Sequence, residues 1–190
     1  LTLHDPPANT YSYEMMQQLD AAILKARMDG NVHVMVLRGS GEKFFCAGAN
    51  IATLKDADPE YKYYFCLHAN ETLCRLEQTP MLVIAALHGH TVGGGLEVAM
   101  AGHYRVAVAS ASLGTPEVNL GIIPGAEGTQ RLPRLVGVAA AVEMCVSGRP
   151  IKAPQGLHWG FIGRGVEGGP RSGGRAVAGQ SRGAPRHGAP

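Results

Sequence analysis

One segment of the sequence constrains the fold more than any other. Met81 to Leu87 is a continuous apolar run, which is typical of a β-strand covered on both faces. Glycines follow at positions 93, 94 and 95, and Leu96 then opens a helix that we expect to run to Ala101. A buried strand, a tight glycine turn and a helix, in that order, predict an α/β domain.

The rest of the chain up to about residue 150 continues this alternation. The spacing of apolar residues and the turn signals between them predict helices over residues 15–26, 58–77 and 135–146, and strands over 32–37 and 105–109. The chain has 190 residues, of which 45% are hydrophobic. That is enough for one domain with a hydrophobic core.

The composition changes near residue 155. Eleven of the last 36 residues are glycine, interleaved with arginine, proline, alanine and serine, and no helical or strand period is present. Such a segment buries little apolar surface to offset the entropy of ordering it. We therefore expect a core domain over residues 1–154 and a disordered or weakly structured tail over residues 155–190.

Charge and cysteine content disfavour several classes of protein. Residues 1–143 carry a net charge of about −4, and the basic surplus of about +6 lies in residues 144–190. The body of the chain therefore lacks the basic face of a nucleic-acid-binding domain. The four cysteines form no C-x-x-C pair and no cluster with zinc spacing, and no apolar run reaches the roughly 18 residues of a membrane span. We expect a reducing compartment, the bacterial cytoplasm or the mitochondrial matrix.

Two carboxylates accompany the glycine turn. Glu97 lies in the first turn of the predicted helix, where the helix dipole favours negative charge, and Glu117 follows Pro116. The bare N–H groups of a helix start can stabilise a developing oxyanion. A second loop of small residues, Cys46 to Ala49, also follows a strand and would point N–H groups at the same oxygen. Each feature alone is equally well explained by packing or capping, but together they indicate acid–base chemistry.

These residues resemble the signatures of the crotonase (enoyl-CoA hydratase/isomerase) superfamily. The segments 43–51, 88–100 and 114–135 carry the resemblance, which extends over residues 1–154. It implies a crotonase, or ClpP-like, fold of repeated ββα units. Family members continue with further helices that cover the active site and help to build trimers or hexamers. Residues 155–190 do not resemble those helices, so we expect this C-terminal helical region to be missing or altered.

The resemblance assigns roles to matching positions. Ala49 and Gly94 would donate two backbone N–H groups to the thioester oxygen of an acyl-CoA, as an oxyanion hole. Glu97 and Glu117 match the two catalytic glutamates of the hydratases. The residues expected to contact the substrate are Ala47, Ala49, Asn50, Ile51, Ala52 and Gly94. Keeping both glutamates favours a lyase that adds water to a 2-enoyl-CoA to give a 3-hydroxyacyl-CoA. The resemblance also implies fatty acid metabolism, with β-oxidation as the expected setting. Coenzyme A enters as part of the substrate, and no metal or redox cofactor is required.

Two alternatives stay open. An enoyl-CoA isomerase needs mainly one glutamate, here Glu117, and an inactive truncated acyl-CoA-binding protein would fit the unusual tail. Three positions depart from the family pattern: Asn50 and His103 stand where Asp is common, and Glu127 replaces a usual Gly. A positive φ at residue 127 would strain Glu127, which would also bring a third carboxylate near the site.

Some chemically capable residues are more simply interpreted as structural. His88 and His90 flank Gly89, and strand-end histidines are more often packing or surface residues than catalytic ones. The aromatic run from Tyr61 to Phe65 fits an acyl-pocket helix and plain core packing equally well.

Overall fold

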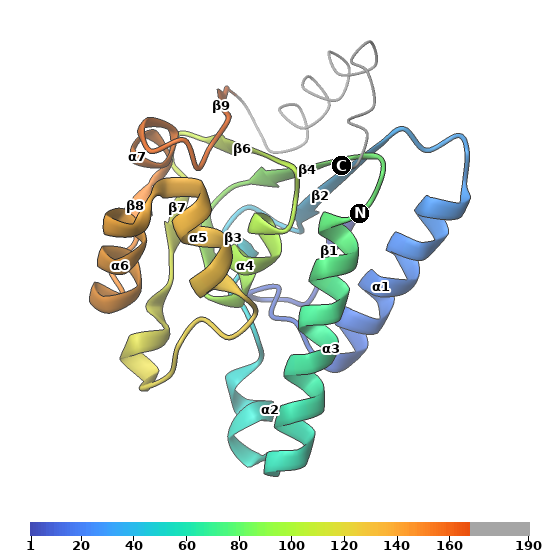
Figure 1. Ribbon diagram of the computed structural model, residues 1–190, viewed down its shortest axis with the longest axis horizontal. Helices are drawn as coiled ribbons and strands as arrows, with labels where there is room; N and C mark the ends of the chain where they lie inside the picture. Colours follow the sequence, from blue (N-terminus) through green and yellow to red (C-terminus); the bar gives the residue numbers. More distant parts are fainter. Residues whose placement is uncertain (168–190) are drawn as a thin grey trace.

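The computed structural model describes residues 1–167 of the chain. Within them the strands form a five-stranded sheet of order β1-β2-β4-β6-β9 and a four-stranded sheet of order β3-β5-β7-β8 (Figure 1). The strands are β1 (Thr2–Leu3), β2 (Val34–Gly39), β3 (Phe44–Cys46), β4 (Leu82–Leu87), β5 (His90–Val92), β6 (Tyr104–Val108), β7 (Ser112–Gly114), β8 (Ile151–Lys152) and β9 (Arg164–Val166). The helices are α1 (Tyr13–Met28), α2 (Ile51–Asp56), α3 (Pro59–Glu77), α4 (Gly94–Met100), the 3₁₀ helix η1 (Pro116–Leu120), α5 (Gly128–Val136), α6 (Val138–Ser147) and α7 (Ala153–His158).

The chain alternates between the two sheets in a repeated pattern. In each repeat the first strand (β2, β4 or β6) joins the larger sheet and the second (β3, β5 or β7) joins the smaller one, and a helix follows. All pairings in the larger sheet are parallel, whereas β8 closes the smaller sheet in antiparallel register with β7. The predicted α/β fold of ββα units is therefore confirmed.

The strand β4 lies at the centre of the larger sheet and is covered on both faces, as its apolar run predicts. Val83, Ala85 and Leu87 belong to the main hydrophobic core, while Ile84 and Ala86 belong to a second cluster on the opposite face. All five are at most 1% exposed. Because alternate residues of a strand point to opposite faces, a continuous apolar run is what burial on both faces requires.

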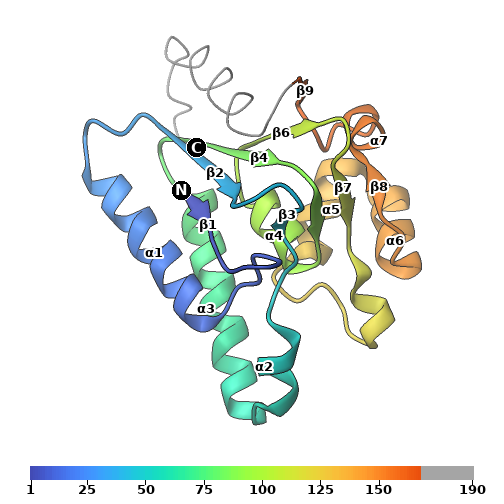
Figure 2. The ribbon, with the colours of Figure 1, turned by 180° about the vertical axis from the view of Figure 1, so that it is seen from behind.

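The helices α1 and α3 lie side by side over one part of the domain (Figures 1 and 2). α3 begins where the sequence predicts, because Asp58 accepts a hydrogen bond from the Tyr61 N–H at 2.7 Å and Pro59 occupies the first turn. The Arg75 guanidinium on α3 pairs with Asp20 on α1 at 2.6 Å. The short helix α4 lies near the middle of the domain (Figure 2) and contacts both β3 and α5.

Two predictions for the C-terminal part need correction. The helix predicted over residues 135–146 is interrupted at Gly137, whose φ of 82° separates α5 from α6. The expected disorder from residue 155 does not hold for residues 155–167, where α7 forms and β9 pairs with β6. Phe161 and Ile162 are each only 2% exposed, so two apolar side chains anchor a glycine-rich segment. The rest of the predicted tail, 168–190, lies outside the described residues.

No helix within residues 1–167 is both long enough and apolar enough to cross a membrane.

Candidate active site

The glycine turn between β5 and α4 places a helix start against Glu117. Gly93 adopts φ 57° and ψ −137°, and its N–H donates to the Gly114 carbonyl at 2.9 Å. A Cβ at this position would be strained by the positive φ and would lie 3.3 Å from Glu117 Oε1. The first glycine of the triplet is therefore required by the backbone conformation of the turn.

Glu97 lies one turn into α4 and is almost completely buried, with 2% exposure. Its Oε1 accepts the backbone N–H groups of Ala126 and Gly128, each at 2.8 Å. The pKa of the Glu97 carboxyl is raised from 4.5 to about 7, because burial and, to a smaller extent, the nearby Glu117 raise it more than the two N–H groups and Arg131 lower it. The side chain is therefore held in place by donors that favour its ionised form while its surroundings disfavour charge.

Glu117 lies in η1 and is 7% exposed. Its Oε2 is buried and has no hydrogen-bond partner among the described residues. Burial raises the pKa of this carboxyl as well. Two buried carboxyls that interact rarely ionise together, so we expect the pair to share one proton near neutral pH. The two side chains differ in that Glu97 Oε1 accepts two backbone N–H groups, whereas Glu117 Oε2 has no donor among the described residues.

The predicted N–H donors, Ala49 and Gly94, belong to two segments that pack against each other. Tyr11 forms a parallel bridge with Ala49: the Tyr11 N–H donates to the Gly48 carbonyl at 2.9 Å, and the Asn50 N–H donates to the Tyr11 carbonyl at 3.1 Å. Because backbone groups alternate in direction along an extended chain, the Ala49 N–H points away from Tyr11. Within residues 1–167, neither the Ala49 N–H nor the Gly94 N–H has an acceptor.

The two segments are in direct contact. A Cβ built on Gly48 would lie 2.8 Å from the Gly94 nitrogen, so the loop that carries Ala49 packs against the start of α4. The free N–H of Gly94 is one of the unsatisfied groups at every helix start. The structure thus brings the two predicted donors to one place, next to the two glutamates.

The other residues predicted to contact the substrate lie next to the Ala49 N–H, in the loop of residues 47–50 and the first turn of α2. Asn50 caps α2, since its Oδ1 accepts the Thr53 N–H at 3.2 Å, and the cap explains why Asn can replace the common Asp. Ile51, at 56% exposure, and Ala52 are exposed in the first turn of α2. Ala47 is half-buried, and its N–H donates to the Ala8 carbonyl at 3.1 Å.

Two contributors to the site leave no local signal in the sequence. The loop of residues 126–128 supplies the donors to Glu97, and the ring of Tyr11 packs on Gly94. Both depend on a close approach between segments far apart in the chain, and no local pattern signals it. In the aromatic run, Phe65 is 6% exposed and stacks on Tyr11 with centroids 5.9 Å apart, whereas Tyr63 is 63% exposed.

The histidines have the structural roles that the sequence favours. His88 is 2% exposed, and burial lowers the pKa of its ring. His90 is exposed and lies against the Phe44 ring, with centroids 5.3 Å apart. His103, at a position where Asp is common, accepts the Val83 N–H at 3.0 Å through Nδ1 and lies 2.7 Å from the Glu77 carbonyl through Nε2. It therefore joins α3 to β4.

Glu127 adopts the positive φ that its glycine-like position suggests. Its φ is 65°, in the left-handed region that costs about 1–2 kcal/mol for a residue with a Cβ. Its carboxylate pairs with Arg131 at 3.0 Å, and Arg131 also binds Glu77 at 2.9 Å. The third carboxylate is thus neutralised by an arginine, and only the backbone on either side of Glu127 contacts Glu97.

We expect the variant Glu127→Gly to be more stable than Glu127→Ala by about 1 kcal/mol, because both lose the ion pair but only alanine keeps the strain. The free energy of unfolding from urea denaturation measures the difference. At the exposed helical position Gln130 the same two substitutions should rank in the opposite order, with alanine more stable by about 1 kcal/mol. If glycine and alanine show the same order of stability at both positions, the left-handed conformation of residue 127 is contradicted.

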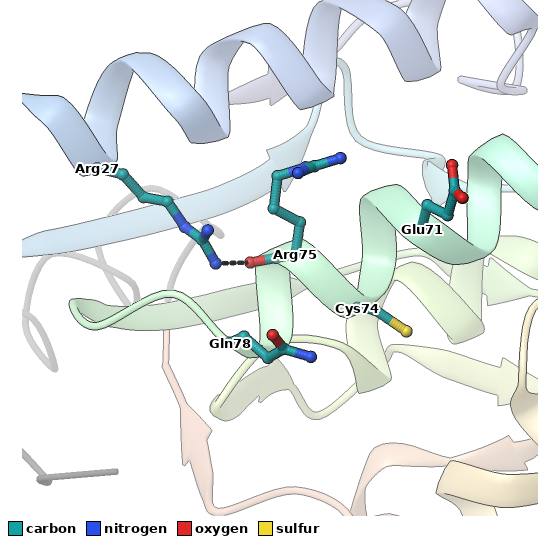
Figure 3. Close-up of a pocket in the computed structure, with 5 residues that line it drawn as sticks. All are labelled: Arg27, Glu71, Cys74, Arg75 and Gln78. Carbon is teal, nitrogen blue, oxygen red and sulfur yellow. Dashed lines mark hydrogen bonds between the residues drawn. The ribbon is translucent and has the colours of Figure 1, made fainter.

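A surface hollow elsewhere on the molecule contains neither glutamate. It is lined by Arg27, Glu71, Cys74, Arg75 and Gln78, and Arg27 donates to the Arg75 carbonyl at 2.6 Å (Figure 3). These contacts join α1 to α3. Among residues 1–167 no group of three or more His, Cys, Asp or Glu side chains is arranged to hold a metal ion.

The fold and the site together define a class. Repeated ββα units, two buried glutamates and two free backbone N–H groups are the features of a crotonase-type domain. The chain belongs to the enoyl-CoA hydratase/isomerase family, whose sequence profile it matches over residues 1–167.

Individual relatives agree with this assignment. The chain is 42% identical over 168 residues to a Bacillus subtilis protein named "Probable enoyl-CoA hydratase" and 38% identical over 168 residues to the "Short-chain-enoyl-CoA hydratase" of Clostridium acetobutylicum. Each match covers 88% of this chain, but 65% and 64% of the relatives. The chain therefore spans slightly less than two thirds of these proteins. An enoyl-CoA hydratase structure from Bacillus anthracis superimposes with a TM-score of 0.88 at 35% identity, covering 95% of this chain and 69% of that one.

Proposed function

We propose that the chain adds water across the double bond of a 2-enoyl-CoA to give a 3-hydroxyacyl-CoA. One observation carries the proposal: two buried glutamates lie beside two backbone N–H groups that have no acceptor among the described residues. Glu97 Oε1 accepts two backbone N–H groups, while Glu117 Oε2 has no partner within residues 1–167. Family membership supports an acyl-CoA thioester as the substrate. The name of the Clostridium relative favours a short acyl chain.

The N–H groups of Ala49 and Gly94 would bind the thioester oxygen. Addition of water at C3 places negative charge on this oxygen as an enolate forms. Preorganised donors of this kind each stabilise a transition state by about 3–4 kcal/mol in other oxyanion holes. The Gly94 N–H also lies at the start of α4, where the partial positive charge of the helix favours an anion.

The glutamates would divide the proton transfers. Glu97, ionised and held by two N–H groups, orients a water molecule, accepts its proton and directs the oxygen to C3. Glu117, whose Oε2 has no hydrogen-bond donor among the described residues, gives its proton to C2. After the reaction Glu97 carries the proton taken from water and Glu117 is ionised. Transfer of one proton from Glu97 to Glu117 then restores the starting state. The expected homotrimer or hexamer, the absence of a cofactor, the place in β-oxidation and the compartment remain predictions.

Product analysis tests the proposal. A hydratase converts a 2-enoyl-CoA to its 3-hydroxyacyl-CoA, whereas an isomerase converts a 3-enoyl-CoA to the 2-enoyl-CoA without gaining the mass of water. We expect the hydrated product from the 2-enoyl substrate by mass spectrometry. Double-bond migration from the 3-enoyl substrate, with no hydration of the 2-enoyl substrate, would instead support the isomerase, which Glu117 alone could serve.

The rate should depend on pH through the buried pair. Because burial raises the pKa of Glu97 to about 7, the base is increasingly protonated as the pH falls, and kcat/KM should decrease below an apparent pKa near 7. Initial hydration rates between pH 5 and 9 measure this. A kcat/KM that stays constant from pH 8 down to pH 5 would contradict an ionised Glu97 as the base.

A further inference from the structure

Tyr11 contacts both halves of the candidate oxyanion site. Its backbone forms the parallel bridge with Ala49 through the two hydrogen bonds to Gly48 and Asn50. Its ring packs on Gly94: a Cβ built on that glycine would overlap the Tyr11 hydroxyl oxygen and would lie 2.8 Å from Cε1 and 2.9 Å from Cζ. The side chain is 5% exposed. One residue thus spans the two backbone segments that carry the free N–H groups.

The position of the hydroxyl follows from helix geometry. In an α-helix the Cα–Cβ direction tilts toward the N-terminus, and the free N–H groups of the first turn point the same way. The Tyr11 hydroxyl lies in the Cβ direction of Gly94, so it lies beside the first residue of α4 and toward the N-terminal end of the helix, where the Gly94 N–H is free. Among the hydrogen bonds within residues 1–167, Tyr11 takes part through its backbone and not through this hydroxyl.

The ring is held in place by aromatic stacking. Tyr11 stacks on Phe65 with centroids 5.9 Å apart and an interplanar angle of 21°, and Phe65 stacks on Tyr61 at 6.1 Å and 16°. Stacked rings at these separations contribute beyond their buried area. The hydroxyl is therefore fixed before any ligand binds, as electrostatic stabilisation of a transition state requires.

We propose that the Tyr11 hydroxyl is a third hydrogen-bond donor of the oxyanion site, reaching the thioester oxygen beside the N–H groups of Ala49 and Gly94. This rests on the proposed function for the identity of that oxygen. Burial, followed by the negative charge of Glu97, raises the pKa of the phenol well above 10. The hydroxyl consequently stays protonated and available as a donor. Phenols serve this purpose in other enolate-forming sites.

The variant Tyr11→Phe keeps the ring and removes only the hydroxyl, and the binding of an enolate tests it without any turnover. Acetoacetyl-CoA is a suitable probe because its enolate has its own ultraviolet absorption. We expect Tyr11→Phe to bind the enolate about ten- to a hundredfold more weakly than the unmodified chain, since a hydrogen bond to a charged group is lost. Binding of free coenzyme A should be unchanged. Where hydration is measured, kcat should fall by a similar factor and KM should change little.

Tyr104→Phe is the matched control, because Tyr104 is 40% exposed on β6 and lies against Gly163, and we expect it to bind the enolate like the unmodified chain. Equal enolate affinity for Tyr11→Phe and the unmodified chain overturns the inference, whether or not hydration occurs. Absence of enolate binding by the unmodified chain also overturns it. If the enolate binds and Tyr11→Phe weakens it while no enoyl-CoA is hydrated, the proposed function fails and the third donor stands.

Discussion

Replacing Glu97 with Gln is expected to lower the kcat of enoyl-CoA hydration by about 10²–10⁴-fold, the usual contribution of a positioned acid–base group. The amide cannot accept the proton of the attacking water. Its oxygen can still accept the two N–H groups that bind Glu97 Oε1 at 2.8 Å, so the loop of residues 126–128 should keep its place. Glu117→Gln is expected to cause a loss of similar size, because an amide at that position is too weak an acid to protonate C2.

Stability measurements separate lost chemistry from lost structure. Because the pKa of Glu97 rises from 4.5 to about 7 on folding, the folded state binds more protons than the unfolded state between these values. Stability of the unmodified chain therefore falls as pH rises through this window. Glu97→Gln lacks that loss, so its free energy of unfolding should improve relative to the unmodified chain from pH 4.5 to 7. The substitution Glu143→Gln, at a side chain 65% exposed on α6, should change neither activity nor stability. Undiminished hydration by Glu97→Gln or Glu117→Gln would show that the substituted glutamate is not required for proton transfer.

Gly95→Ala is expected to reduce the free energy of unfolding by about 3 kcal/mol or more, which is the upper range for overpacking. A Cβ on Gly95 would overlap the carbonyl oxygen of Cys46 and would lie 2.6 Å from its carbonyl carbon and 2.9 Å from its Cβ. Backbone cannot rotate away as a side-chain end can, so the chain near Cys46 must shift. Because this segment leads directly to Ala49, the two free N–H groups should separate as well. Hydration should consequently decrease by more than the unfolded fraction explains.

Gly30→Ala is the matched control for this substitution. No atom lies within 4 Å of a Cβ built on Gly30, and its φ is not in the left-handed region. We expect its stability to differ from that of the unmodified chain by no more than about 0.5 kcal/mol. Urea denaturation and hydration rates of both variants measure the effects. A Gly95→Ala protein as stable and as active as Gly30→Ala would contradict the close packing of the two segments.

Long elements could be predicted from the sequence because their signals are local. The apolar run of β4 and the Asp58-Pro59 start of α3 placed both elements within a residue or two. The strands β3, β5 and β7 have only three residues each, too few for an alternating pattern to be legible. The strand β9 could not be predicted from its own residues, because it forms only by pairing with β6 and by the burial of the neighbouring Phe161 and Ile162.

In the site, too, the residues in local motifs could be predicted, whereas the contacts between distant segments could not. Glu97, Glu117 and the glycine triplet were visible as motifs, and the structure places them together. The sequence could not show that the three glycines meet different demands: a positive φ at Gly93, space for the Tyr11 ring at Gly94 and contact with Cys46 at Gly95. These demands arise from tertiary contacts, which no single segment of the sequence encodes.

Hydration of crotonyl-CoA by the purified 190-residue chain tests the central claim most directly, with its mass in solution measured alongside. The assay follows the loss of the enoyl-thioester absorbance and identifies the product by mass. Two glutamates and an oxyanion site predict formation of the 3-hydroxyacyl-CoA, at a rate abolished in the Glu97→Gln, Glu117→Gln double variant. Tight binding of the thioester without any turnover by the folded chain would contradict the account and would support an acyl-CoA-binding protein instead.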